Sequence, residues 1–335
     1  MARSPSAIAR LDAAAAAKKL HRELDLQTRT RESGGAIDVF EVIAELDIPL
    51  VFKPLERAQG LCLPKPLFGI MVTTKRTLSI QKYTAAHELG HLLLGHEPSI
   101  DIEILERGPL ASGSGRDLKE IAAEAFAAEL MLPRWLYSIH VQRQKWSIAE
   151  LRDPAVTYQL SLRLGASYEA TCWGLLSNAI LPRDAVDTLR RAKIATMKAQ
   201  LGDGFRPSDS WADVWRFTQR DDGGVIGNTD RDLVRLELPE NSSAGFEWDL
   251  KTLRDAGLEI LDDRSEFSED PIVYGAPTTR RVIARPVTTS RQVVAIEQKQ
   301  PWSQNADTCL TVTLKFDGAE TGGFSKATRR KLGAV

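Results

Sequence analysis

Cysteine and histidine are scarce in this chain, whose 335 residues include three cysteines and five histidines. Cys62, Cys172 and Cys309 are odd in number and lie more than a hundred residues apart. This spacing excludes a disulfide framework and a CxxC metal site. Free cysteines are typical of the reducing cytoplasm, so we expect a cytoplasmic location.

Long apolar runs and an excess of one charge sign are also lacking. No run approaches the ~20 residues that a membrane-spanning helix needs, and the formal net charge is −1. Neither a membrane nor a direct nucleic-acid partner is therefore expected. Residues 160–176 resemble a helix-turn-helix, but the second helix at 167–178 has no lysine or arginine to read bases, which favours core helices.

The length of the chain and its changes in composition divide it into five parts. Residues 1–35 are expected to be an N-terminal helical extension, and residues 36–200 an α+β domain that is mostly helical after a small sheet. Residues 201–230 are rich in glycine, aspartate and serine, which predicts a flexible linker. Strand patterns follow at 231–320, and the basic residues at 321–335 are expected to be a frayed tail.

The hydrophobic period changes along the chain. Strands are expected at 48–55 and 67–81, and helical patterns from Tyr83 onward. In "CLTVTLKF", apolar Leu310, Val312, Leu314 and Phe316 alternate with polar residues, as in a half-buried strand. Several such strands with turn signals between them predict an all-β sandwich for the C-terminal part.

Three of the five histidines lie in "YTAAHELGHLLLGH", residues 83–96. His87 and His91 are one helical turn apart, so both rings project from the same face and can chelate one Zn²⁺. Glu88 lies beside the first ligand, where its carboxylate can reach a water molecule at the metal. Chance predicts on the order of 0.01 such HExxH motifs in a chain of this composition. The apolar flanks predict a buried helix, where unsatisfied polar groups would be costly.

A catalytic zinc usually takes three protein ligands. His96 is about 140° further round the helix than His91, so we expect it to cap the helix or orient a ligand. The helix predicted at 118–133 supplies better donors, because Glu120 and Glu124 lie one turn apart among small alanines. Either glutamate can be the third ligand.

"YTAAHELGHLLLGH" followed by "EIAAEAFAAELMLP" resembles the ImmA/IrrE family of metallopeptidases over about residues 36–195. The resemblance implies a zincin-like fold and assigns roles residue by residue: zinc ligands His87, His91 and Glu120, and catalytic Glu88. Glu124 occupies a position that is often asparagine in the family and stays the alternative ligand. Tyr137 and His140, on the following helix, are candidates to stabilise the oxyanion.

The implied activity is an intracellular zinc endopeptidase that makes restricted cuts in a regulatory protein. The family's substrates are typically repressors or antitoxin-like proteins of stress-response and transcription circuits. The alternative is a non-proteolytic regulatory protein with a structural metal site. Glu88 favours the enzyme, because a structural site needs no general base.

"ELPENSSAGFEWDL" and the strands after it resemble the chagasin-type inhibitors of cysteine peptidases, over about residues 231–317. Those are immunoglobulin-like β domains with three inhibitory loops at one end. The corresponding loop residues here are Asn241 to Gly245, Gly275 to Thr279, and Pro301 with Trp302. The second loop departs from the family's glycine-rich pattern, and glutamine replaces an arginine in the third. We expect these loops to bind a papain-like cysteine peptidase, a substrate or the chain's own peptidase domain; an inhibitor module fused to a peptidase-like domain is a further alternative.

Overall fold

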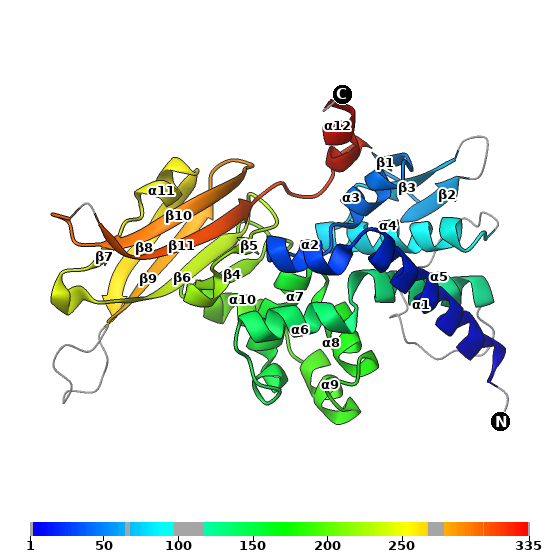
Figure 1. Cartoon of the computed structure of the whole chain (residues 1–335), viewed down its shortest axis with the longest axis horizontal. Coiled ribbons are helices and arrows are strands. Elements are labelled where there is room, and N and C mark those ends of the chain that lie inside the picture. The colour runs from blue at the N-terminus through cyan, green and yellow to red at the C-terminus, as the bar shows by residue number, and fades with distance from the viewer. Residues whose placement is uncertain (1–2, 64–67, 97–116, 267–277, 304, 334–335) are drawn as a thin grey trace.

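The computed structural model describes residues 3–63, 68–96, 117–266, 278–303 and 305–333. A helical part with one small sheet is followed by a part built from two further sheets (Figure 1). The helices are α1 (Pro5–Glu23), α2 (Leu26–Ser33), α3 (Val39–Glu45), α4 (Leu78–Leu93), α5 (Leu118–Met131), α6 (Arg134–Arg143), α7 (Pro154–Leu164), α8 (Tyr168–Ser177), α9 (Arg183–Arg190), α10 (Ile194–Gly202), α11 (Lys251–Asp255) and α12 (Lys326–Gly333), with short 3-10 turns η1 (Glu150–Arg152), η2 (Gln219–Asp221) and η3 (Ser242–Ala244). The strands are β1 (Leu50–Lys53), β2 (Gly60–Leu63), β3 (Gly69–Thr73), β4 (Val214–Thr218), β5 (Gly224–Ile226), β6 (Leu233–Glu240), β7 (Glu247–Trp248), β8 (Leu258–Glu266), β9 (Thr278–Pro286), β10 (Arg291–Lys299), β11 (Ala306–Lys315) and β12 (Gly323–Phe324).

The small sheet has the strand order β12-β1-β3-β2. β3 ends at Thr73 and α4 begins at Leu78, so the strand prediction for residues 67–81 is wrong from residue 74 onward. Leu78 and Ile80 alternate with polar residues as in a strand, but they continue into the helix that carries the histidines. α1 packs along α5, so the N-terminal helix is part of this helical core.

Two four-stranded sheets form the C-terminal part, in the orders β4-β6-β9-β8 and β5-β11-β10-β7. Leu310, Val312 and Leu314 of β11 are buried while Thr311 between them is exposed, as the alternation predicts. The all-β architecture of this part is therefore confirmed. No described helix has the length and apolar character to cross a membrane.

The segment at 201–230 is folded, although its composition predicts a flexible linker. It contains β4 and β5, which pair in parallel with β6 and β11. Arg163 of α7 donates two hydrogen bonds to Asp221, at 3.0 and 2.7 Å, and both side chains are buried. Gln144, directly after α6, donates to the same carboxylate at 2.6 Å. These partners lie far away in the sequence, so local composition does not reveal that the β part is fastened to the helical part.

The C-terminal residues return to the helical part rather than forming a frayed tail. β12 pairs antiparallel with β1 and becomes the outer strand of the small sheet. Gln81 of α4, fully buried, donates to the Glu320 carbonyl at 2.9 Å and accepts from the Glu320 amide at 2.8 Å. α12 then lies against α3 (Figure 1). The chain thus leaves the helical part, builds the sandwich and comes back to complete the first sheet.

Candidate metal centre

Close packing of α4 on α5 builds the candidate site. A Cβ on Gly90 would lie 3.1 Å from the Phe126 ring and 3.3 Å from the Cα of Ala123. Glycine and alanine at this crossing therefore let the two helix backbones approach closely. The approach brings Glu120 of α5 to the face of α4 that carries the histidines.

His87, His91 and Glu120 form a group that could hold a metal ion, with ligand atoms all within 4.8 Å of one another. The two Nε2 atoms are 3.0 Å apart, and each lies 3.3 Å from an oxygen of Glu120. Tetrahedral bonds of ~2.0–2.1 Å place neighbouring ligand atoms about 3.3 Å apart. Both histidines are almost fully buried, at 1% and 3% exposure. The spacing and the donor set fit a zinc ion.

Glu124 is not part of this group. It lies one turn further along α5 and lines a neighbouring groove with Tyr83 and Trp173. Of the two glutamates that the sequence offers as third ligand, the geometry therefore favours Glu120.

His96 contacts one of the candidate ligands. Its Nδ1 lies 3.0 Å from the Nδ1 of His91. Because Nε2 of His91 faces the metal group, its Nδ1 carries the proton and donates to His96. Burial is the largest cause that lowers the pKa of His96, and it favours the neutral ring that can accept this bond. This is the arrangement expected of a residue that orients a ligand.

Glu88 is buried against β2, at 2% exposure. A Cβ on Gly60 would lie 2.5 Å from Thr84 and 2.9 Å from Oε1 of Glu88, so only glycine leaves room here. The sequence interpretation missed Gly60 together with β2, because both lie between the strands predicted at 48–55 and 67–81. Burial, and then Glu88, raise the pKa of Cys62 on the same strand to about 11, so its thiol stays protonated.

Tyr137 and His140 do not join the site, contrary to the oxyanion hypothesis. The hydroxyl of Tyr137 donates to the Thr171 carbonyl at 3.1 Å, in the core. Nε2 of His140 lies 3.1 Å from the Gly35 carbonyl, where α6 meets the segment before α3. Both rings are held by core contacts because α6 buries this face.

His140 makes stability pH-dependent. Burial, and then Arg163, lower its pKa to about 3, and its buried Nδ1 has no hydrogen-bond acceptor among the described residues. The unfolded chain therefore takes up the proton first, so stability is full above pH ~6.5 and falls toward pH ~3. We expect His140→Asn to reduce the slope of unfolding free energy against pH by about 1.4 kcal/mol per unit between pH 6 and 4. Urea titrations at several pH values measure it, and an unchanged slope contradicts this assignment.

Two of the three loops of the β part lie together. A Cβ on Gly245 would lie 2.8 Å from the Trp302 ring, and Gln300 donates to the Ala244 carbonyl at 2.9 Å. Trp302 is 74% exposed. These loops are at the end of the sandwich that faces away from the helical part (Figure 1). Gly275 lies outside the described residues, while Thr278, at the end of the second loop, is 2.7 Å from Ser242 through their hydroxyls.

Comparison with known proteins separates the same two parts. Residues 44–175 match the family model of the IrrE N-terminal-like domain, and residues 229–316 match that of the chagasin family peptidase inhibitor I42. Amoebiasin-2 of Entamoeba histolytica is 19% identical over 107 residues, covering 32% of this chain and 86% of the relative. The crystal structure of the cysteine protease inhibitor EhICP2 from Entamoeba histolytica matches 31% of this chain and 96% of that chain, with 18% identity and a TM-score of 0.28. The solution structure of amebosin matches the same shares, with 16% identity and a TM-score of 0.25. The two family-model matches confirm both resemblances inferred from the motifs.

Proposed function

We propose that this chain is a zinc-dependent endopeptidase that makes restricted cuts in a regulatory protein, such as a repressor or an antitoxin-like partner. The observation that carries the proposal is the group of His87, His91 and Glu120 at metal-ligand spacing, with Glu88 beside it. The match of residues 44–175 to the IrrE N-terminal-like family supports a peptidase. A purely structural site is disfavoured, because it needs no buried acid next to its ligands.

Each residue of the site has its own role in the proposed cleavage reaction. When bound, the zinc ion supplies Lewis acidity that polarises the scissile carbonyl. Glu88 takes the proton of the attacking water and delivers it to the leaving amine, as a general base and then a general acid. Its burial against Gly60 holds the carboxylate in one place. His96 keeps the ring of His91 in the tautomer that directs Nε2 at the metal.

The substrate has a sheet edge available close to Glu88. β2 is the last strand in the order β12-β1-β3-β2, and among the described residues no further strand pairs with it. Gly60, at the start of β2, lies against Glu88 on the side where any other residue would carry its Cβ. An extended peptide that adds to this edge would pass along the general base. Extended, locally unfolded segments of a protein are therefore the substrates that this edge fits.

The test of the metal centre is zinc content in matched variants. We expect purified protein to hold about one zinc per chain, and Glu120→Gln to lower zinc affinity by at least about tenfold. Glu124→Gln is the matched control one turn away and should bind zinc normally. Metal analysis after dialysis against a graded chelator gives the affinities. Loss in Glu124→Gln with retention in Glu120→Gln would assign the third ligand to Glu124; no zinc in any variant would refute the site.

The β part supports a second activity, the binding of a papain-like cysteine peptidase. Its match to the chagasin family over residues 229–316 favours this partner, and Trp302 presents an exposed ring on a loop stiffened by Pro301. The chain's own peptidase domain is a poorer candidate, because the loops face away from it (Figure 1).

Trp302 is expected to dominate this interaction. Exposed aromatic anchors contribute roughly 2 kcal/mol or more, so Trp302→Ala should weaken inhibition of a papain-like peptidase by about 30-fold. Trp211→Ala is the matched control, because Trp211 is also exposed, at 52%, but lies outside the loops. Inhibition constants measured with papain decide the matter. Equal constants for wild type and Trp302→Ala would exclude these loops as the binding surface.

A further inference from the structure

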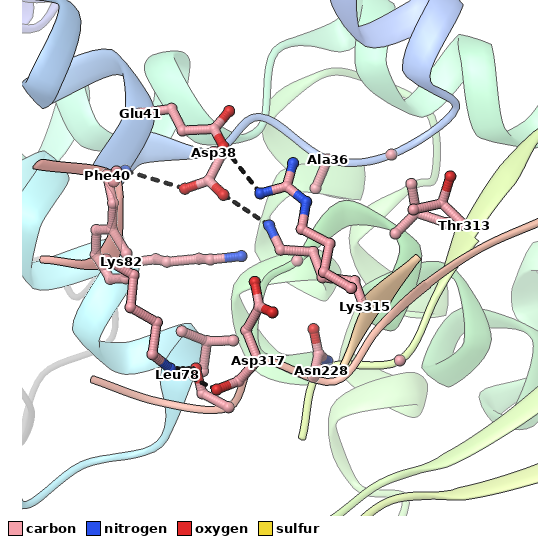
Figure 2. A pocket seen from close by; sticks show the side chains of 18 of the residues that line it. Ala36, Asp38, Phe40, Glu41, Leu78, Lys82, Asn228, Thr313, Lys315 and Asp317 are labelled. Carbon is pink, nitrogen blue, oxygen red and sulfur yellow. Dashed lines mark hydrogen bonds and ion pairs between the residues drawn. The ribbon is translucent and has the colours of Figure 1, made fainter. Parts of the chain in front are cut away.

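A pocket of about 250 Å³ lies where the helical part, the sandwich and the C-terminal segment meet (Figure 2). Its walls come from α3, α4 and α7, from β11, and from the residues that lead into α12. None of the candidate metal ligands lines it. The pocket is therefore a feature separate from the metal centre, although it shares helix α4 with it.

Most charged groups around the pocket already have partners. Lys315 of β11 donates to Asp38 at 2.7 Å. Glu41 is paired with Arg291 at 3.2 Å and with Arg330 at 3.1 Å. These pairs join the sandwich and α12 to the start of α3, so they close the rim of the pocket.

Lys82 is the exception. It is buried, at 7% exposure, and its ammonium group points into the pocket (Figure 2). No described residue forms an ion pair or hydrogen bond with it. Asp38, the carboxylate with the largest electrostatic effect on Lys82, already accepts a hydrogen bond from Lys315. Burial lowers the pKa of Lys82, while Asp38 acts against this by favouring the charged form. An ammonium group held in this way is costly without a counter-charge.

Two further polar groups face the same space without partners among the described residues. The carboxylate of Asp317 points toward Lys82 and Lys315 (Figure 2), and it forms no ion pair there. The side-chain amide of Asn228 lies beside it and makes no described hydrogen bond. Lys326 also lines the pocket, but its ammonium group donates to the backbone carbonyls of residues 317–319. Among the described residues, the pocket thus offers one ammonium group without a hydrogen bond, Lys82, one carboxylate without an ion pair, Asp317, and the amide of Asn228.

We propose that this pocket binds a free amino acid, whose carboxylate pairs with Lys82 and whose ammonium group pairs with Asp317. A simple anion would leave Asp317 without a partner, and a simple amine would leave Lys82 without one. A ligand with both charges satisfies both, and Asn228 adds a hydrogen bond. The volume is at the small end for ligand sites, which suits a molecule of this size.

The ligand would also join the parts of the chain. The Asn228 carbonyl accepts a hydrogen bond from the Gly318 amide at 2.8 Å, so the entry to the sandwich and the exit from it lie side by side. A molecule between Lys82 and Asp317 bridges α4 to this crossing point. Binding therefore stabilises the docked arrangement of the sandwich on the helical part.

Melting of the full chain with each of the twenty amino acids tests the proposal, and it does not depend on peptidase activity. We expect at least one amino acid to raise Tm, by about 5 °C at a hundredfold excess over its Kd. Its N-acetyl and carboxamide derivatives should bind at least about tenfold more weakly, because each lacks one charge. Calorimetric titration of the same ligands gives the Kd values.

Two isosteric variants locate the site. Lys82→Met and Asp317→Asn should each weaken binding of the same amino acid by at least about tenfold, whereas Lys19→Met, at an exposed side chain of α1, should bind normally. Far-ultraviolet circular dichroism verifies that each variant is folded. Binding that survives in both pocket variants overturns the proposal, as does the absence of any binder. Binding of inorganic phosphate that depends on Lys82 but not on Asp317 would also overturn it, in favour of a simple anion site.

Discussion

Glu88→Gln is expected to lower the rate of substrate cleavage by about 10²–10⁴-fold while zinc stays at one equivalent. Glutamine has the shape of glutamate, so the packing against Gly60 and Thr84 is kept. What is lost is the carboxylate that accepts and returns the proton. Cleavage of the captured protein substrate is followed over time by gel electrophoresis, and metal analysis of the same enzyme sample gives the zinc content.

The Glu88→Gln protein also provides the means to find that substrate, because an uncut partner should stay bound during affinity capture. Glu23→Gln is a suitable control, since Glu23 is an exposed residue of α1 paired with Lys19. Full cleavage by Glu88→Gln, with zinc present, would contradict the enzymatic proposal. It would favour the alternative of a regulatory protein with a structural metal site.

Removing residues 318–335 is expected to destabilise the helical part, by about 3–5 kcal/mol. The deletion strips β12 from β1 and leaves buried Gln81 without both hydrogen bonds to Glu320. Each buried polar group left unsatisfied costs about 1–3 kcal/mol. Urea unfolding followed by circular dichroism measures the loss of stability. Zinc affinity shows whether the metal site on α4 is also weakened.

The matched control for this deletion keeps the segment and removes charge. Arg330→Ala with Lys331→Ala breaks exposed pairs with Glu41 and Asp47, each worth about 0–1 kcal/mol. If the double variant loses as much stability as the deletion, the segment acts through its charge and not by completing the sheet. An unchanged midpoint in the deletion would show that the segment contributes nothing.

The dependence on residues 318–333 also governs how the sandwich can be removed in experiments. A truncated chain that simply stops before the sandwich also loses β12 and α12, so a lost activity would be wrongly assigned to the loops. Replacing residues 229–317 by a short glycine link would keep β12 and α12, because Asn228 and Gly318 are hydrogen-bonded neighbours, but it would leave β4 and β5 without their partners β6 and β11. Substitutions in the loops, such as Trp302→Ala, therefore test recognition by the loops without these losses.

The sequence by itself determined the histidine pair, the neighbouring acid and several strands of the sandwich, although not β4 and β5, which lie in the segment predicted to be a linker. These features depend on local periods: a helix places His87 and His91 on one face, and a strand buries alternate residues such as Leu310 and Val312. The order of motifs along the chain was also sufficient to identify both family resemblances.

Only the tertiary structure decided which glutamate faces the histidines, because Glu120 and Glu124 lie on the same helix and differ only in how α5 crosses α4. It also decided the fate of residues 201–230 and 321–335, whose polar composition predicts flexibility. Asp221 is ordered by Arg163, and Glu320 by Gln81, through buried hydrogen bonds that join positions 58 and 239 residues apart. No local pattern encodes such pairs, since a polar side chain is buried or solvated according to whether a distant partner reaches it. For the same reason, the sequence did not reveal the pocket at Lys82, which exists only where three separate parts of the chain meet.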